Sequence, residues 1–122
     1  MTNHRLVMPG DLNSHNALFG GQLLRWVDED AWLAASLEFP GCRFVTIGMD
    51  RVEFRRSCKL GDILRFEARR ARTGTTSATY TVEVFRHNDD GGAMFTTHVT
   101  LVRVDERGEK TALPSSASPD RP

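Results

Sequence analysis

The residues with the clearest chemical potential lie in one segment, Asp11 to Ala35, which reads DLNSHNALFGGQLLRWVDEDAWLAA. Within it, Gly20 and Gly21 stand where the pattern predicts the start of a helix. Backbone N–H groups beside paired glycines are sterically open, and at a helix N-terminus they lie at the positive end of the helix dipole. Such a place can hold an oxyanion or a polarised carbonyl.

Asp28 is the candidate reactive side chain of the same segment. At about 3.6 residues per turn, the apolar residues of the expected helix share one face: Leu24, Val27, Ala31, Ala34 and Ala35. Asp28 falls inside that face, next to Val27 and Ala31. A buried carboxylate is costly unless it is hydrogen-bonded, and carboxylates held in clefts are candidate acids, bases or nucleophiles. The alternative is that Asp28 lies at the edge of the face and reaches water, as we expect for Glu29 and Asp30.

One long helix is predicted to carry these residues. Asn3 to Met8 predicts an opening strand, and Asp11 to Ala17 has the Asp, Asn and Ser residues that are typical of a loop. The helix is predicted from Gly21 to Glu38, and Pro40-Gly41 ends it. The expected order is therefore strand, loop and helix.

After the helix the sequence changes to a period of about 2, which is typical of strands. Four long strands are predicted: Arg43–Phe54, Ile63–Thr73, Ser77–His87 and Ala93–Val104. We expect the first strand to be largely buried and the four to follow one another as a meander. One helix and an antiparallel sheet of this size predict an α+β fold in which the sheet wraps around the central helix, because the sheet must cover an apolar face.

The length of the chain predicts one compact domain, since 122 residues are close to the usual size of a domain. We assign residues 1–113 to this domain. Residues 114–122, PSSASPDRP, have the composition of a disordered tail.

Composition and charge exclude several classes of function. Lys plus Arg and Asp plus Glu both number 16, so no net charge favours nucleic acid or an anionic membrane. No apolar run approaches the roughly 18 residues of a membrane span. Cys42 and Cys58 lack CxxC spacing and no signal peptide precedes them, which predicts reduced thiols in a cytoplasmic protein. The four histidines lack zinc-ligand spacing, so we expect no metal.

With these residues established, the chain resembles the hotdog-fold acyl-CoA thioesterases, in particular the acyl-CoA hydrolase group of the thioesterase superfamily. The signature of that group is a turn with Pro, Asp and Asn, then Phe-Gly-Gly, then a helix that contains Asp. The matching residues are Pro9, Asp11, Asn13, Phe19-Gly20-Gly21, Leu23-Leu24 and Asp28-Glu29. Further matches extend the likeness from about Met8 to Pro114: Val45-Thr46, Phe54, Gly61-Asp62 and Gly74-Thr75-Thr76-Ser77.

The resemblance implies an enzyme that hydrolyses an acyl-CoA thioester. Asp28 would be the catalytic carboxylate, acting as general base on water or as nucleophile toward the thioester carbon. Asn13 would help to orient substrate or water, and the N–H groups near Gly20-Gly21 would polarise the carbonyl. Two further groups would contact the pantetheine and phosphates of coenzyme A: the pair Arg55 and Arg56, and the turn of Gly74, Thr75, Thr76 and Ser77.

The resemblance also implies partners. The acyl-CoA is the substrate, so coenzyme A is not a separate cofactor and no other cofactor is implied. In this family the site lies across a two-fold interface, so Asp28 of one subunit would face the glycines and loop of the other. The implied assembly is a homodimer with shared active sites, which can gather into tetramers or hexamers.

The chain departs from the family pattern at Asn16, where many relatives have Gly, and at Arg55-Arg56-Ser57, where an apolar residue and Pro are more usual. Two other functions fit the same fold. A non-catalytic acyl-CoA-binding module would keep the ligand groove, and a dehydratase or hydratase would need His15 and Asp28 as a proton-transfer pair. The depth of an acyl tunnel is expected to depend on how four aromatic residues pack: Trp26, Trp32, Phe54 and Phe66.

Overall fold

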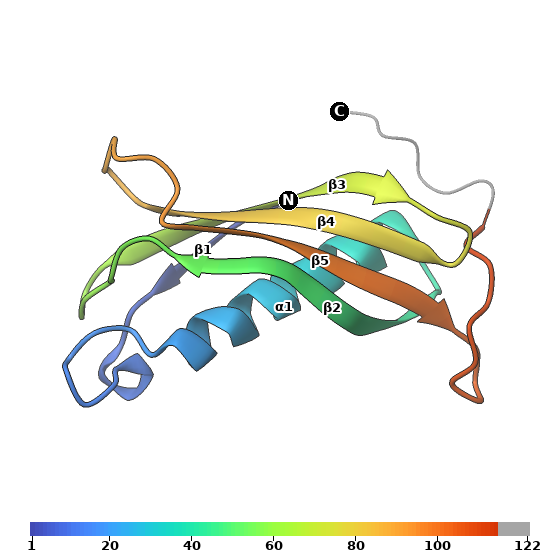
Figure 1. The fold of residues 1–122 in the computed structure, drawn as a ribbon, viewed down its shortest axis with the longest axis horizontal. Coiled ribbons are helices and arrows are strands. Elements are labelled where there is room, and N and C mark those ends of the chain that lie inside the picture. The colour runs from blue at the N-terminus through green and yellow to red at the C-terminus, as the bar shows by residue number, and fades with distance from the viewer. Residues whose placement is uncertain (115–122) are drawn as a thin grey trace.

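The computed structural model describes residues 1–114, in which five antiparallel strands form one sheet and one long helix lies across one face of it (Figure 1). The elements in chain order are β1 (Thr2–Leu6), a short 3-10 turn (Pro9–Asp11), α1 (Gly20–Glu38), β2 (Arg43–Phe54), β3 (Ile63–Thr73), β4 (Ser77–Arg86) and β5 (Phe95–Val104). The predicted elements and the sheet wrapped around a helix are confirmed. The predicted tail lies, apart from Pro114, outside the described residues.

The order of the strands differs from the predicted meander. β3, β4 and β5 do follow one another, but β2 pairs with β5 at the far edge, so the order is β1-β3-β4-β5-β2. Residues 55–62 carry the chain from β2 across the end of the sheet to β3. This connection is held in place by Leu18 N–H, which donates to the Cys58 carbonyl at 2.8 Å, and by Arg55 N–H, which donates to the Met94 carbonyl at 3.0 Å. A period of 2 identifies a strand but not its partner, so the meander was wrong.

The buried face of α1 is turned relative to the predicted one. Val27, Ala31, Ala34 and Ala35 are buried as expected, but Leu23, Trp26 and Asp30 join them, whereas Leu24 and Asp28 are only partly buried. Opposite them lie buried side chains of the sheet, which include Leu64, Phe66, Tyr80, Val82 and Leu101. The core therefore lies between α1 and the inner face of β3, β4 and β5.

Asp30, which we expected to be solvated, has no exposed surface. Its Oδ1 accepts hydrogen bonds from Arg5 Nη2 at 2.7 Å and Asn3 Nδ2 at 3.1 Å. The Arg5 guanidinium lies 5.5 Å from the ring centroids of both Trp26 and Phe66. The prediction was wrong because the partners come from β1, whose inward side chains are polar, and nothing in the sequence of the helix shows them.

β2 is also more exposed than predicted. Phe44 is its one buried residue, whereas Val45, Ile47, Val52 and Phe54 are between 43 and 58% exposed. The reason is the position of the strand at the edge of the sheet, where one side has no neighbour within the chain. Such an edge is a template for pairing with a further strand. None of the helices in residues 1–114 combines the length and apolar character needed to cross a membrane.

Candidate active site

The chain enters α1 through a loop that Asp11 holds in place. Asp11 Oδ2 accepts from Met8 N–H at 2.8 Å, and the Asp11 carbonyl accepts from Phe19 N–H at 2.8 Å. Asp11 Oδ1 accepts from Gln22 Nε2 at 2.7 Å. One residue thus bonds the turn before the loop, the residue that precedes the helix, and the first turn of α1. The start of the helix is thereby placed relative to the loop.

Asn13 shapes the same loop with its side chain. Its Oδ1 accepts from His15 N–H at 2.8 Å and from Ala17 N–H at 3.2 Å. Asn16, the departure from the family pattern, has φ of 63°, in the left-handed region that Asn tolerates better than most residues. Asn16 therefore supplies the backbone conformation for which a glycine is usual. The neighbouring side chain of His15 is exposed.

Gly20 and Gly21 form the first turn of α1, as predicted to within one residue. Their N–H groups have no acceptor inside the helix, because the first turn lacks preceding carbonyls, and the cap residue Phe19 offers no side-chain acceptor. A Cβ on Gly20 would lie 3.3 Å from the Phe54 ring, and one on Gly21 would lie 2.7 Å from the Phe19 ring. A side chain at either position would therefore press on an aromatic ring, whereas glycine leaves the amides of this first turn open to a ligand.

Asp28 lies two turns further along α1 and is partly exposed. Its Oδ1 accepts a short hydrogen bond of 2.6 Å from Thr46 Oγ1 on β2. Beside it is a cavity of about 350 Å³ lined by Asp28, Glu29, Trp32 and Leu33, which we call the helix pocket. Sequence reasoning did not select Thr46 as a functional residue. Its only signal was its place beside Val45 in the family pattern.

A second cavity, of about 340 Å³, lies at the start of the helix. We call it the loop pocket, and its lining includes Asn13, Gly20, Phe54, Arg55, Arg56 and Cys58. The structure thus brings the predicted Asn13, Gly20, Arg55 and Arg56 together. Asp28 is not part of this group, because the helix rise places it about 10 Å beyond Gly21 along the axis.

Arg55 and Arg56 make different contacts. Arg56 Nη1 donates to Asp89 Oδ2 at 3.1 Å, and Arg56 Nη2 donates to the Gly92 carbonyl at 2.9 Å. Arg55 Nη1 donates to Thr96 Oγ1 at 3.1 Å and keeps more exposed surface. Arg56 therefore ties residues 55–58 to the loop between β4 and β5.

The turn of Gly74, Thr75, Thr76 and Ser77 lies at the opposite end of the sheet (Figure 1). Gly74 N–H donates to the Ser77 carbonyl at 2.7 Å, and a Cβ on Gly74 would lie 2.7 Å from Ser77 Oγ. Along β3, about 35 Å of strand separate this turn from the end near Arg55. Within one chain the two predicted coenzyme A groups are therefore far apart.

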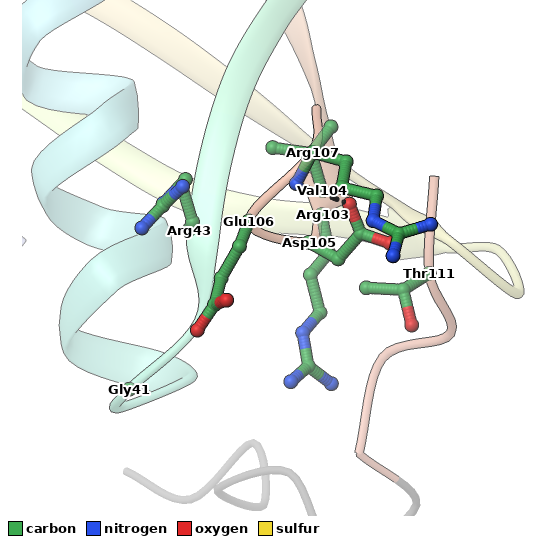
Figure 2. A pocket seen from close by; sticks show the side chains of 8 residues that line it. All are labelled: Gly41, Arg43, Arg103, Val104, Asp105, Glu106, Arg107 and Thr111. Atoms are coloured by element: carbon green, nitrogen blue, oxygen red, sulfur yellow. Dashed lines mark hydrogen bonds between the residues drawn. The ribbon is translucent and has the colours of Figure 1, made fainter. Parts of the chain in front are cut away.

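Near that turn is a third cavity, of about 480 Å³, whose lining includes Arg43, Arg103, Asp105, Glu106 and Arg107 (Figure 2). In Figure 2 the three arginines point in different directions rather than toward one point. Arg103 Nη1 donates to the Ala112 carbonyl at 2.8 Å. The cavity is of mixed charge and lies away from Asp28, so we do not assign the chemistry to it.

Neither cysteine is bonded in a disulfide. Burial raises the pKa of the Cys58 thiol to about 11, against which the positive charge of Arg86 acts only in part. Cys58 is therefore a neutral thiol at physiological pH, although it lines the loop pocket. Residues 1–114 contain no group of three or more His, Cys, Asp or Glu side chains that could hold a metal ion.

The comparison with known sequences gives the family. Residues 15–93 match the model of the thioesterase superfamily. An uncharacterized acyl-CoA thioester hydrolase of Buchnera aphidicola is 32% identical over 95% of this chain and 90% of its own length. The acyl-CoA thioester hydrolase YciA of Escherichia coli K12 is 31% identical over 89% of this chain and 86% of its own.

Solved structures agree with the sequence matches. The hexameric thioesterase y2039 of Yersinia pestis has a TM-score of 0.85 and 31% identity, over 93% of both chains. An acyl-CoA hydrolase of Staphylococcus aureus, determined with butyryl coenzyme A and coenzyme A, has a TM-score of 0.80 and 32% identity over 93% of this chain and 68% of its own. The chain belongs to the hotdog-fold thioesterase superfamily, in its acyl-CoA thioester hydrolase group.

Proposed function

We propose that this protein hydrolyses an acyl-CoA thioester to a free acid and coenzyme A, with Asp28 as the catalytic carboxylate. The observation that carries the proposal is the position of Asp28, which Thr46 holds at 2.6 Å beside a largely apolar pocket. Asp28 acts as general base on water or as nucleophile toward the carbonyl carbon. The names of the relatives support the same reaction.

The Gly20 and Gly21 amides polarise the thioester carbonyl in this proposal, and Asn13 orients substrate or water beside them. A relative supports the assignment of Asp28 and Asn13. Solved variants of the Staphylococcus aureus acyl-CoA hydrolase replace one Asp, one Thr and one Asn by Ala. The Asn and Asp of those variants have the same sequence spacing as Asn13 and Asp28.

We further propose that the active site is shared between two copies of the chain. One carbonyl cannot contact both Gly21 and Asp28 of one chain, because about 10 Å of helix separate them. The exposed edge of β2, with apolar Val45 and Ile47, offers a surface on which a second copy can pair. Hexameric relatives support an assembly larger than the dimer.

A two-fold axis at the β2 edge also explains how two groups of residues that lie far apart in one chain can contact the same coenzyme A. Antiparallel pairing of two β2 strands puts the end of one strand beside the start of the other. Arg55 and Arg56 of one copy then lie at the same end of the joined sheet as the turn from Gly74 to Ser77 of the other. In this proposal both groups contact one coenzyme A, and Arg56 also holds the loop between β4 and β5.

The test of the catalytic proposal is release of free thiol from acyl-CoA by the wild-type protein and by Asp28→Asn. Removal of a general base lowers turnover about 100-fold to 10,000-fold, whereas coenzyme A affinity should change little because Asp28 faces the acyl side. Equal turnover by the two proteins would remove Asp28 from the mechanism.

Complementation tests the shared site. Asp28→Asn and Asn13→Ala are each expected to be nearly inactive. When they are unfolded together and refolded, mixed dimers contain one intact site made of Asp28 from one copy and Asn13 from the other. About a quarter of the wild-type activity should return, because half of the dimers are mixed. No recovery, with mixed dimers verified by mass spectrometry, would place the whole site within one chain.

A further inference from the structure

Two hydrogen bonds join α1 to β2 side by side. Thr46 Oγ1 donates to Asp28 Oδ1 at 2.6 Å, and Trp32 Nε1 donates to the Phe44 carbonyl at 3.3 Å. Asp28 and Trp32 are one helical turn apart, so they project from the same side of α1. The indole therefore bridges the gap between helix and strand about 6 Å beyond the carboxylate.

The helix pocket that begins at Asp28 has the character of an acyl site. At about 350 Å³ it lies near the lower end of the range for small-ligand cavities. Beyond the carboxylates its lining is Trp32 and Leu33, which are 44% and 39% exposed. Large apolar side chains exposed beside a placed polar group are typical of a ligand or partner contact. An acyl chain satisfies this apolar lining.

The other aromatic residues that bear on acyl-chain length lie elsewhere. Trp26 is buried in the core, where its ring meets Phe66 edge to face at 6.1 Å. Phe54 lies against Gly20 and 5.2 Å from the Phe95 ring, in the loop pocket. Of these four aromatic residues, only Trp32 lines the pocket that contains Asp28.

We propose that Trp32 determines which acyl chains the enzyme accepts, by closing the helix pocket so that short chains fit and long chains do not. This inference rests on the proposed function, because it places the thioester carbonyl at Asp28. An acyl chain that leaves a carbonyl held there enters the helix pocket and meets the indole after about one helical turn. A short chain ends before the ring, whereas a long chain must displace it.

The indole is held against such displacement. Its N–H is bonded to the Phe44 carbonyl, and Phe44 is only 4% exposed and packs against the Phe39 ring at 5.9 Å. Moving the ring therefore breaks its hydrogen bond to the Phe44 carbonyl. The Phe44 side chain is anchored in the core, so the carbonyl cannot easily follow the ring. Short acyl chains are preferred to long ones because a long chain must move the Trp32 ring, whereas a short chain makes apolar contacts without moving it.

The experiment compares kcat/KM for thiol release from a panel of acyl-CoAs, acetyl to palmitoyl, using wild type, Trp32→Ala and Trp32→Phe. Wild type should prefer butyryl-CoA to palmitoyl-CoA. Trp32→Ala should raise the palmitoyl-to-butyryl ratio at least about tenfold, since one methylene in an apolar pocket is worth about 10-fold to 200-fold. Trp32→Phe keeps most of the bulk of the side chain, so its palmitoyl-to-butyryl ratio should lie between those of wild type and Trp32→Ala. If the alanine variant folds poorly, the ratio of Trp32→Phe serves as the test.

Leu60→Ala is the matched control, because Leu60 is 56% exposed and lies outside the helix pocket. Its chain-length profile should equal that of wild type. An active Trp32→Ala with an unchanged profile would overturn the inference and leave the proposed hydrolase activity intact, as would a wild type that prefers palmitoyl-CoA. Thiol release by wild type from no member of the panel would overturn the proposed function, and this inference with it.

Discussion

Thr46 on β2 and Asp28 on α1 are joined by a 2.6 Å hydrogen bond, in which the hydroxyl donates to Oδ1. The bond fixes one oxygen of a carboxylate that also lines the helix pocket. A hydrogen bond to a charged group is worth about 1.5–3 kcal/mol. Thr46 is therefore expected to orient the carboxylate.

Replacing Thr46 by Val removes the donor and keeps the branched shape. We expect kcat for thiol release to fall about 10-fold to 100-fold, and Thr46→Ser, which restores the hydroxyl, to recover most of it. Steady-state rates at saturating acyl-CoA measure the effect. If Thr46→Val turns over as fast as wild type, the bond has no part in the reaction.

Gln22→Leu tests the attachment of the loop to α1. The variant removes the 2.7 Å bond to Asp11 Oδ1, so the glycine amides at the start of the helix should be placed less accurately. A loss of about 1 kcal/mol corresponds to roughly a fivefold decrease in kcat/KM. Ser14→Ala is the control, since Ser14 is exposed in the same loop. Equal losses in the two variants would argue against a specific role for Gln22.

Asp30→Ala should destabilise the fold strongly. It leaves the charge of Arg5 in a largely buried position without its 2.7 Å partner, and breaking such a pair costs about 3–5 kcal/mol. Glu29→Ala removes a neighbouring, exposed partner of Arg5 and should cost at most about 1 kcal/mol. Urea unfolding at one fixed protein concentration compares the two variants. Similar midpoints would contradict the buried role of Asp30.

The contacts of Asp89 predict that the free energy of unfolding depends on pH. The Gly91 N–H, together with Arg56 and Arg86, lowers the pKa of this carboxyl below its ordinary value of 3.8. Its contribution to stability is therefore present above pH 3.8 and lost as the pH falls through the lowered folded-state pKa. The difference in unfolding free energy between wild type and Asp89→Asn should be constant near neutral pH and shrink in acid. A difference that grows on acidification would show the opposite sign of the shift.

Cys58 should resist alkylation in the folded protein. It is 3% exposed, and its pKa of about 11 leaves it almost wholly protonated at pH 8. Cys42 is partly exposed and should be the first site that iodoacetamide modifies. Peptide mapping with and without urea distinguishes the two thiols, and rapid labelling of Cys58 without urea would show that the loop pocket opens.

The long elements could be predicted because their signals are local. The bounds of β2 and β3 agree with the sequence pattern, and α1 begins one residue earlier than predicted. A change of period from about 3.6 to 2, and breakers such as Pro40-Gly41, depend only on neighbouring residues. The same holds for the placement of Gly20 and Gly21 at the start of the helix.

The surroundings of the two carboxylates on α1 could not be predicted in this way. The helical pattern placed Asp28 within the apolar face and Asp30 on the solvated side, yet Asp30 is buried and Asp28 is only partly buried. What distinguishes them is what lies opposite: Arg5 of β1 for Asp30, and Thr46 of the edge strand β2 for Asp28. These partners lie outside the helix sequence, so the helical pattern of apolar residues cannot predict them.

The sequence by itself thus determined the elements of this thioesterase, its family and the position of Asp28 and the glycines along the chain. Only the tertiary structure decided that β2 occupies the edge of the sheet, that Thr46 bonds Asp28, and that Trp32 lines the pocket beside it. The physical reason is that periodicity and turn residues act locally, whereas burial and pairing depend on which surfaces the whole fold brings together.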